Sequence, residues 1–413
     1  MTNYNVYNCG HSSVVERLVA NEKVEGSTPF ARSRIMLKLC VEGWRYINNS
    51  FAIVNQRQLL EFLKLPIYLR HKDVPYFKKS WNVSKNSNGF SFDENQKLNL
   101  IKNPKPNESF DVTYRISSPF DLGPSTSKKT YIFTTREFEL DETHFKNGKL
   151  FDFNNKNNFF LAASSNWSKN GLVQYGFNES QVKVITLGVD PKVFFPLGFE
   201  KKNRLREKLR IKEEDFVLLS IGAMTENKGI KQLILAFALL RKKNKNIKLI
   251  LKDQSNLYNI FAQTHIKDLK NSKYKDLIDD EIISNILFIS NNLNCEQVND
   301  LYGISDCYVS PYLAEGFGLT PLEASSAGTP IVVTKGGSTD DYFNPIMGAQ
   351  ISSKFIKDNN ATYLKPNIDS LVENINLIIN NPKNFGGKSS HSLIAKEFSV
   401  NKSVQKLLNE INI

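Results

Sequence analysis

Cysteine is scarce in this chain of 413 residues, and its spacing excludes the sites that cysteines usually build. The four cysteines, Cys9, Cys40, Cys295 and Cys307, contain no Cys-x-x-Cys pair, the spacing typical of zinc sites and redox motifs. We therefore expect free thiols in a reducing cytoplasm rather than disulfides.

Patterns that bind metal ions are also missing. The five histidines have no ligand spacing. Asp-x-Asp does not occur, and the acidic pairs 279–280 and 340–341 lack that spacing. We therefore expect no metal and no other cofactor.

Long apolar runs are absent as well. Runs such as Phe216 to Ala223 are under half of the ~20 residues that a membrane-spanning helix needs, so we expect no transmembrane helix.

Two domains are expected from the length, because a single hydrophobic core rarely serves so long a chain.

The net charge is strongly positive, at +12. Such a charge is compatible with nucleic acid, with an anionic membrane surface or with a phosphorylated substrate, and equally with a solvated surface rich in Lys and Asn. Aromatic stacking motifs and clustered basic runs are lacking, so we expect no nucleic-acid partner.

Residues 1–35 do not read as part of a domain. The stretch from Cys9 to Ser33 has neither helical nor strand periodicity and no apolar segment of a signal peptide. It can be back-translated into the D-arm and T-arm of a transfer-RNA gene, at their usual distance. We therefore expect a non-native extension, with translation starting at Met36, and the genomic DNA tests this.

From Met36 onward short apolar strands alternate with amphipathic helices. In the first half, strands are expected at 37–43, 111–116, 130–135 and 183–188, a helix at 51–65, and surface loops at 78–108. After a charged linker and helix at 200–214, strands are expected at 216–222, 247–252, 285–290, 306–312 and 330–334, with helices at 229–241, 295–304 and 319–327.

This alternation predicts an α/β protein with two Rossmann-like, doubly wound domains and a cleft at the carboxyl ends of the strands. The expected domains are residues 36–195 and residues 196–390. A C-terminal helix within 391–413 is expected to pack back on the first domain.

The sequence EGFGLTPLE at 315–323 combines two glutamates with a flexible loop. Glu315 follows a buried strand, and Gly316-Phe317-Gly318 can expose backbone N–H groups. Thr320 and Pro321 have the character of an N-cap and a first helical residue. A helix N-terminus of this kind favours a phosphate.

Glu323 has two interpretations at this point. Thr320-x-x-Glu323 has the spacing of a capping box, in which the glutamate only returns a hydrogen bond to the cap. Alternatively, its carboxylate binds a ligand. Glu315 has a surface salt bridge as its main competing explanation.

The sequence GAMTENKG at 222–229 repeats the pattern of strand, glycine and turn. Lys228 precedes a helix and can reach a phosphate as a point charge. On its own the motif is weak, because lysines are common at helix starts.

Together with VKVITLGVDPKVFFP at 182–196, these motifs resemble the retaining GT-B glycosyltransferases of the family 4 (group 1) type. The resemblance covers about residues 160–345, with Gly43 at the place of the family's first glycine-rich loop. It implies transfer of a sugar from a nucleotide-diphosphate donor to an unidentified acceptor, with retention of configuration and without a metal. The resemblance also implies that residues 36–195 form the acceptor side and residues 196–390 the donor side.

The resemblance also implies a role for each motif residue. Glu315 and Lys228 are the expected catalytic residues: Glu315 faces the donor sugar and Lys228 stabilises the departing diphosphate. Glu323 holds the ribose hydroxyls. Further donor-binding residues are expected at Gly316, Phe317, Gly318, Leu319, Thr320, Gly222, Lys252 and Gly43.

Two positions depart from the family pattern. Ala223 stands where many members have an arginine, and Lys252 is the candidate substitute, against a solvated lysine at a strand end. No histidine clearly matches the one often placed beside the donor: His144 lies in a polar loop, and Arg115 is better placed but could equally be a structural cation.

Other function classes remain open at this stage. They are a sugar-nucleotide epimerase, a phosphorylase (without a signature lysine for pyridoxal) and a binding module of the same fold, which the missing arginine favours. Peripheral contact with an anionic inner-membrane surface is a further expectation for this basic, cytoplasmic protein.

Overall fold

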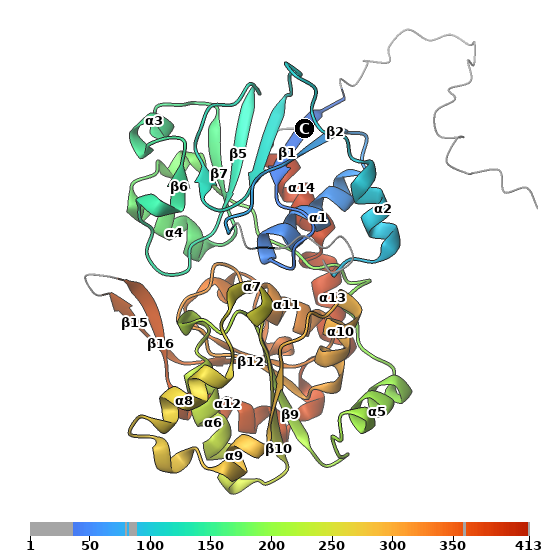
Figure 1. Ribbon diagram of the computed structural model, residues 1–413, viewed down its shortest axis with the longest axis vertical. Coiled ribbons are helices and arrows are strands. Elements are labelled where there is room, and N and C mark those ends of the chain that lie inside the picture. Colours follow the sequence, from blue (N-terminus) through green and yellow to red (C-terminus); the bar gives the residue numbers. More distant parts are fainter. Residues whose placement is uncertain (1–35, 79–80, 82–88, 358–360, 412–413) are drawn as a thin grey trace, which may run out of the picture. The chain divides into compact units, whose positions relative to one another are not determined.

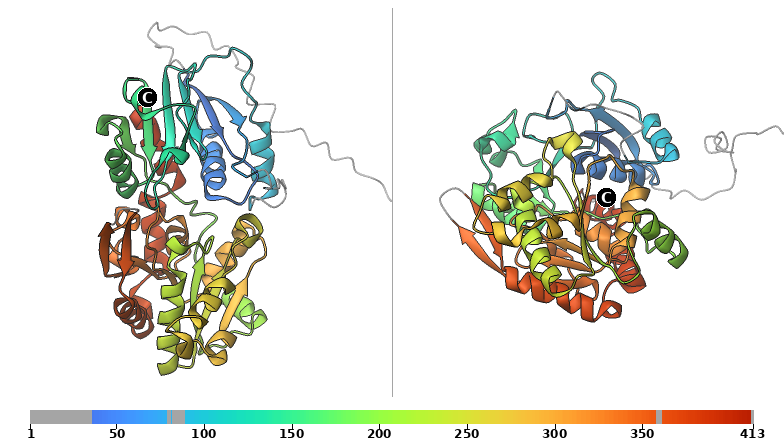
Figure 2. Two further views of the ribbon diagram at one scale, coloured as in Figure 1. Left: turned by 60° about the vertical axis from the view of Figure 1, so that its left-hand side comes forward. Right: turned by 60° about the horizontal axis from the view of Figure 1, so that its bottom comes forward.

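The computed structural model describes residues 36–78, 81, 89–357 and 361–411 (Figure 1). The expected extension at 1–35 therefore lies outside the described residues. The rest folds around two parallel six-stranded sheets, one in each half of the chain (Figures 1 and 2).

The first sheet has the strand order β2-β1-β3-β5-β7-β8. Its strands are β1 (Lys38–Gly43), β2 (Tyr68–Asp73), β3 (Val112–Ile116), β5 (Lys129–Thr134), β7 (Phe159–Ala163) and β8 (Val182–Val184). The accompanying helices are α1 (Ser50–Phe62), α2 (Phe92–Leu100), α3 (Leu150–Asn154) and α4 (Asn166–Tyr175), and a short parallel pair joins β4 (Phe120–Asp121) to β6 (Phe145–Lys146).

The second sheet has the order β11-β10-β9-β12-β13-β14. Its strands are β9 (Phe216–Ile221), β10 (Ile247–Lys252), β11 (Ile286–Ile289), β12 (Cys307–Ser310), β13 (Ile331–Thr334) and β14 (Gly348–Ile351). The helices of this half are α5 (Phe199–Lys208), α6 (Ile230–Lys243), α7 (Ser255–Tyr258), α8 (Gln263–Lys270), α9 (Asp280–Ser284), α10 (Cys295–Ile304), α11 (Leu319–Ser326), α12 (Ile368–Asn380) and α13 (Gly387–Glu397), and an antiparallel hairpin is formed by β15 (Ser353–Lys357) and β16 (Thr362–Pro366).

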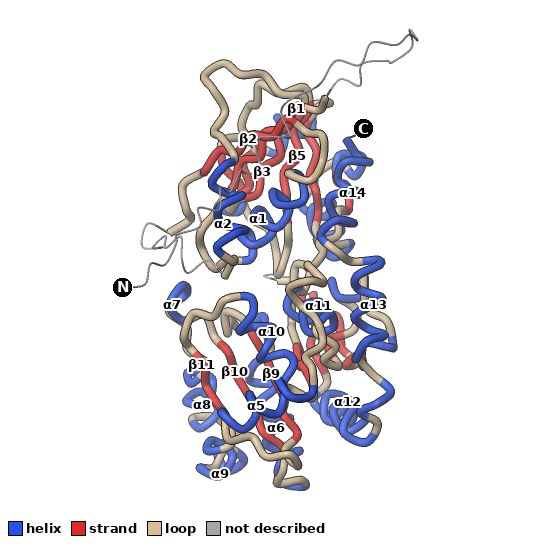
Figure 3. The backbone as a smooth tube through the Cα atoms, turned by 90° about the vertical axis from the view of Figure 1, so that its right-hand side faces the viewer, coloured by secondary structure: helices blue, strands red, loops and turns tan. Residues whose placement is uncertain are grey.

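Apolar residues on both faces explain why these strands are covered on both sides. Val217, Leu218 and Leu219 follow one another in β9 and are all fully buried, as expected for parallel strands between helical layers. Figure 3 shows helices on either side of the strands in this half. The expected doubly wound α/β architecture is confirmed.

The last helix, α14 (Val400–Ile411), crosses to the first half and packs against α1 (Figure 1). Val404 and Leu407 are fully buried there. The hydroxyl of Tyr131 donates to the carbonyl of Glu410 at 2.8 Å, which fixes the end of the helix to β5.

Three local expectations were wrong. The strand expected at 183–188 ends at Val184, because its partner β7 ends at Ala163. The supposed loop region 78–108 contains α2, which Ser91 and Glu94 begin with a capping box. Helix α11 has Gly318, not Thr320, as its N-cap.

The strand order of the second sheet changes direction between β9 and β12. In open parallel sheets, ligands bind at the carboxyl edge beside such a reversal.

Within the described residues, no helix combines the length and apolar character needed to cross a bilayer.

Candidate active site

A cavity of about 320 Å³ opens at this carboxyl edge, between the two halves of the protein. The loops after β9 and β12 contribute Gly222, Lys228 and Glu315 to its lining. The first half contributes Asn48 beside the start of α1 and Glu137 after β5. Both halves therefore face one cavity.

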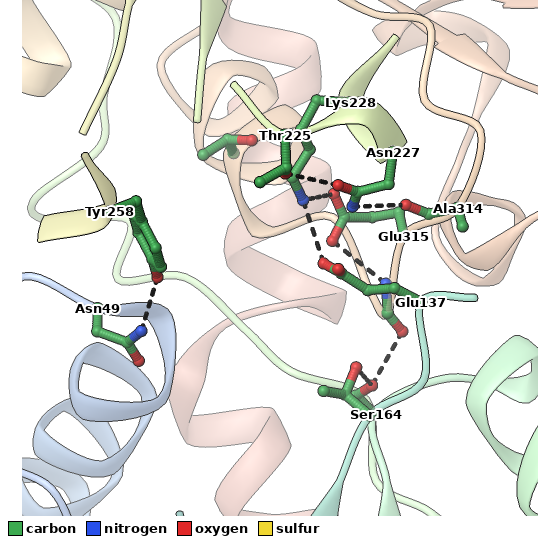
Figure 4. A network of polar contacts seen from close by, with 12 residues as sticks. Asn49, Glu137, Ser164, Thr225, Asn227, Lys228, Tyr258, Ala314 and Glu315 are labelled. Atoms are coloured by element: carbon green, nitrogen blue, oxygen red, sulfur yellow. Dashed lines mark hydrogen bonds and ion pairs between the residues drawn. The ribbon is translucent and has the colours of Figure 1, made fainter. Parts of the chain in front are cut away.

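Lys228 lies between two carboxylates in this cavity (Figure 4). Its Nζ is 2.6 Å from Oε2 of Glu315 and 3.3 Å from Oε1 of Glu137. The side chains of Lys228 and Glu315 are 21% and 15% exposed, whereas that of Glu137 is 46% exposed. The two predicted catalytic residues are thus in direct contact, and a third acid joins them.

The carboxylates keep Lys228 charged. Burial alone would lower the pKa of Lys228, but Glu315 and, after it, Glu137 outweigh burial, so the pKa lies above its ordinary value. A permanently charged ammonium can attract an anionic group that enters the cavity.

The position of Lys228 is fixed by its neighbours. The side-chain Nδ2 of Asn227 donates to the carbonyl of Ala314 at 3.0 Å. The main-chain carbonyl of Asn227 accepts from the N–H of Leu313 at 2.7 Å. Gly229 has φ of +67°, and a Cβ there would lie 1.9 Å from the carbonyl oxygen of Pro311. These contacts join the loop after β9 to the loop after β12.

Gly316 is held by serines of the first half. Its carbonyl accepts hydrogen bonds from the hydroxyls of Ser164 at 2.9 Å, Ser165 at 2.6 Å and Ser168 at 3.1 Å. A Cβ at position 316 would lie 1.7 Å from Oγ1 of Thr135. This glycine therefore permits close contact between the halves, and it does not itself line the cavity.

The next two residues shape the start of α11. Phe317 is buried against Tyr342, with ring centroids 5.3 Å apart. Gly318 has φ of +87°, and its carbonyl accepts from the hydroxyl of Tyr342 at 2.8 Å. Because the N-cap is a glycine, it has no side chain to bind the first amides of α11, at Leu319 and Thr320. Both residues line the cavity.

The capping-box interpretation of Glu323 is wrong. Thr320 is inside the helix, and its Oγ1 accepts from the hydroxyl of Tyr308 at 2.8 Å. Glu323 lines the cavity and accepts from the hydroxyl of Tyr302 at 2.9 Å. Burial raises the pKa of Glu323 to about 7, although Tyr302 and Arg57 favour the ionised form.

Gly222, Ala223 and Lys252 lie along the same wall. Lys252 is 4% exposed, so it is not the solvated strand-end lysine that was the alternative. Its Nζ donates to the carbonyl of Asp253, and burial lowers its pKa, with Asp253 opposing this. At Gly222 a Cβ would have Lys228 Cγ as its nearest neighbour, at 3.9 Å, so this position is open toward the cavity.

Gly43 does not line the cavity. A Cβ there would lie 2.8 Å from both Nδ2 of Asn55 and the carbonyl oxygen of Ile116, so close packing accounts for this glycine. His144 is also elsewhere, paired with Asp141 at 2.9 Å. The nearby residues 48 and 50 line the cavity in place of Gly43.

Arg115 is a structural cation. Its guanidinium is 2.9 Å from Oε2 of Glu42 and donates to the carbonyls of Asp121, Gly123 and Pro124. These bonds hold the turn after β3, away from the cavity lining.

Glu137 and Arg57 also line the cavity, although the sequence motifs do not include them. Glu137 follows a predicted strand, the same signal that identified Glu315. Arg57 lies within α1, where nothing in the sequence distinguishes it. Its guanidinium contacts Glu94, lies 3.8 Å from Oδ2 of Asp190 and 3.4 Å from Sγ of Cys295.

The halves also meet at the opposite side of the cavity. Nδ2 of Asn49 donates to the hydroxyl of Tyr258 at 2.8 Å (Figure 4). Nε2 of Gln254 donates to the carbonyl of Asn48 at 3.2 Å. Tyr258, Gln254 and Asn48 all line the cavity.

Comparison with known proteins relates this geometry to a family. The family described as "Glycosyl transferases group 1" matches residues 201–396. An uncharacterized glycosyltransferase of Methanocaldococcus jannaschii is 26% identical over 224 residues, which are 53% of each chain. The chain spans about half or less of the length of the first curated relatives it matches.

Solved structures share the fold over most of the chain. Sucrose-phosphate synthase from Thermosynechococcus elongatus superimposes with a TM-score of 0.64 at 12% identity, covering 91% of this chain and 98% of the other. HepE from Anabaena, crystallised with UDP and glucose, gives a TM-score of 0.59 at 15% identity, covering 91% and 99%. The second half of the chain, residues 201–396, thus matches the group 1 glycosyltransferase family, and the two halves together have the GT-B fold of these solved structures.

Proposed function

We propose that the protein transfers a sugar from a nucleotide-diphosphate donor to an acceptor, with retention of the anomeric configuration and without a metal ion. The observation that carries this proposal is the contact between Lys228 and Glu315 at the point where the second sheet reverses its strand order. The Lys228 ammonium and the Glu315 carboxylate suit a substrate that has an anionic group at one end and hydroxyl groups at the other.

The diphosphate of the donor is proposed to bind at Lys228. Its negative charge competes with the two carboxylates for the ammonium, and its charge grows as the bond to the sugar breaks. A preplaced cation stabilises that developing charge. The N-terminus of α11, capped by Gly318, adds the positive end of a helix dipole at Leu319 and Thr320.

Glu315 is proposed to bind the donor sugar. When the diphosphate takes over Lys228, the Glu315 carboxylate is free to accept hydrogen bonds from sugar hydroxyls. Its other oxygen, Oε1, already accepts from the N–H of Gly316 at 3.2 Å. The main-chain bonds around Ala314 keep this carboxylate in place.

Glu323 is proposed to bind the ribose hydroxyls. It lies one helical turn into α11, and its carboxylate is supported by Tyr302. Hydroxyl donors from the ribose would favour the ionised carboxylate over the protonated one, and this gives the proposal a signature in its pH dependence.

The decisive experiment measures donor binding and donor hydrolysis together. UDP-, GDP- and ADP-sugars are screened for thermal stabilisation, beginning with UDP-glucose because a protein of similar fold was crystallised with UDP and glucose. Slow hydrolysis is then followed in wild type and in Glu315→Gln, with and without EDTA. We expect binding and EDTA-resistant hydrolysis in wild type, and loss of hydrolysis in the variant.

Absence of stabilisation by every nucleotide sugar would contradict the proposal. A binding module without turnover is the second candidate, and Ala223 in place of the usual arginine favours it. Binding by wild type with no hydrolysis and no transfer to any acceptor extract would support that alternative. The buried Lys252 on the same wall is the candidate replacement for that arginine.

We further propose a cytoplasmic location with peripheral contact to an anionic membrane surface. The support is the net charge of +12, which is attracted to acidic headgroups and is screened by salt. Co-sedimentation with vesicles containing 30% phosphatidylglycerol, at low and at physiological salt, tests it against phosphatidylcholine vesicles.

A further inference from the structure

Glu137 brings a charge of the first half into contact with the candidate catalytic lysine. Its Oε1 lies 3.3 Å from Nζ of Lys228, and the side chain points toward Lys228 in Figure 4. At 46% exposure it remains accessible to a molecule that enters from the first half. The proposed donor site lies on the other half, so Glu137 faces it.

The backbone around Glu137 is fixed by α4. The N–H of Arg136 donates to the hydroxyl of Ser168 at 3.0 Å, and the indole N–H of Trp167 donates to the carbonyl of Glu137 at 3.1 Å. The Arg136 guanidinium lies over the Trp167 ring and pairs with Glu139, so it is directed away from Lys228. The main chain that carries Glu137 is therefore held in position by α4.

The charges at this end of the cavity are unbalanced. Two carboxylates, Glu137 and Glu315, contact the single ammonium of Lys228. Of the other basic residues lining the cavity, Arg57 lies against the carboxylates of Glu94 and Asp190, and Lys252 is buried, with its Nζ donating to the main-chain carbonyl of Asp253. A diphosphate that engages Lys228 would leave Glu137 as an unneutralised anion beside the reacting sugar.

We propose that Glu137 binds the acceptor and determines its chemical class: an uncharged hydroxyl compound with no phosphate close to the reacting hydroxyl. A carboxylate accepts hydrogen bonds from hydroxyls but repels phosphates. The inference rests on the proposed function, because it requires the donor diphosphate to occupy Lys228. It assigns the acceptor side of the cavity, which the motif residues do not reach.

The test compares matched acceptors in the full-length protein. With the donor found in the screen, kcat/KM is measured for neutral hexoses and for the corresponding hexose 1- and 6-phosphates, in wild type, Glu137→Gln and Glu137→Lys. We expect wild type to prefer the neutral partner of each pair by about tenfold or more. Glu137→Gln should narrow that preference, and Glu137→Lys should reverse it.

Glu139→Gln is the matched control. Glu139 is two residues away, is 41% exposed and pairs with Arg136 instead of Lys228. It should leave the preference unchanged, and the melting temperature of each variant shows whether it is folded. Donor hydrolysis in water, which needs no acceptor, tests the proposed function separately.

Two results would overturn the inference while leaving the proposed function intact. One is normal donor hydrolysis with phosphorylated hexoses preferred, or with no neutral acceptor used faster than water. The other is an unchanged preference in both Glu137 variants. Failure of all donor binding and hydrolysis would instead overturn the proposed function and, with it, this inference.

Discussion

Nζ of Lys228 lies 2.6 Å from Oε2 of Glu315, although 87 residues separate them in the sequence. The contact arises because β9 and β12 are neighbours in the sheet, so the loops that follow them leave the same edge side by side. The ammonium is therefore held next to a carboxylate at this edge of the sheet.

Replacing Lys228 with glutamine should abolish most of the activity. Removal of a preplaced charge at a developing anion costs on the order of 10²-fold in kcat, so we expect about that loss, together with weaker donor binding. Lys231→Gln is the control, because Lys231 pairs with Glu226 and Asp268 at 2.9 and 3.0 Å, away from the cavity lining. Equal activity in the two variants would contradict the role of Lys228.

Glu323 should make stability depend on pH. Its pKa rises from the ordinary carboxyl range to about 7 in the folded protein. A raised carboxyl pKa means that the folded state binds the extra proton, so the stability gained is complete below the unfolded pKa and is lost as pH rises through 7. Thermal unfolding should show Glu323→Gln gaining stability relative to wild type between pH 5 and pH 8.

The same titration should appear in nucleotide binding. If ribose hydroxyls bind only the ionised carboxylate, a single proton with pKa about 7 predicts about tenfold tighter UDP binding at pH 8 than at pH 6. Calorimetry compares UDP binding by wild type and by Glu323→Gln at both pH values. Titration of the nucleotide's own phosphate affects both proteins equally, so the difference between them reports on Glu323. Tyr302→Phe removes a donor to the carboxylate and should move the transition to higher pH.

Two glycines should respond differently to alanine. At Gly222 the added Cβ has space but projects toward the cavity, so stability should stay within about 0.5 kcal/mol while donor affinity falls. At Gly316 the Cβ would meet Thr135 at 1.7 Å, and such overpacking costs about 2 kcal/mol or more. Urea unfolding and nucleotide titration of both variants check this; the reverse pattern would refute it.

The serines around Gly316 should also differ. Ser164→Ala leaves two other hydroxyls on the Gly316 carbonyl, so we expect a loss below about 0.5 kcal/mol. Ser165 additionally caps α4 by accepting from the N–H of Ser168. Ser165→Ala should therefore lower the free energy of unfolding in urea by about 1 kcal/mol. Equal losses of stability in the two variants would argue against the additional capping role of Ser165.

Much of the fold could be predicted because its strands are continuous apolar runs. Strand β10 and helix α10 have the predicted bounds, Ile247–Lys252 and Cys295–Ile304. Helix α2 was missed because its polar composition resembles a loop, and only the tertiary contact of Leu98 with the core buries one side of it. The end of β8 depended on the length of its partner strand.

The site could be predicted only in part. Lys228 and Glu315 follow strands of the second half, where motif and strand coincide. Thr320 fits the sequence pattern of an N-cap. In the structure, however, the N-cap of α11 is Gly318, which has a positive φ. Glu137 and Arg57 belong to the first half, and their meeting with the cavity depends on how the two sheets face each other.

The bonds at Gly316 have a mechanical consequence. One carbonyl oxygen receives hydroxyls from three serines of the opposite half, within one residue of Glu315. If the halves rotate to admit a substrate, the bonds at Gly316 mark the axis of that rotation. Residues of the two halves then move apart by a distance that grows with their distance from Gly316. The cavity would then open most at Tyr258 and Asn49 and least at Lys228, so the reacting end keeps its geometry while the far end acts as the entrance.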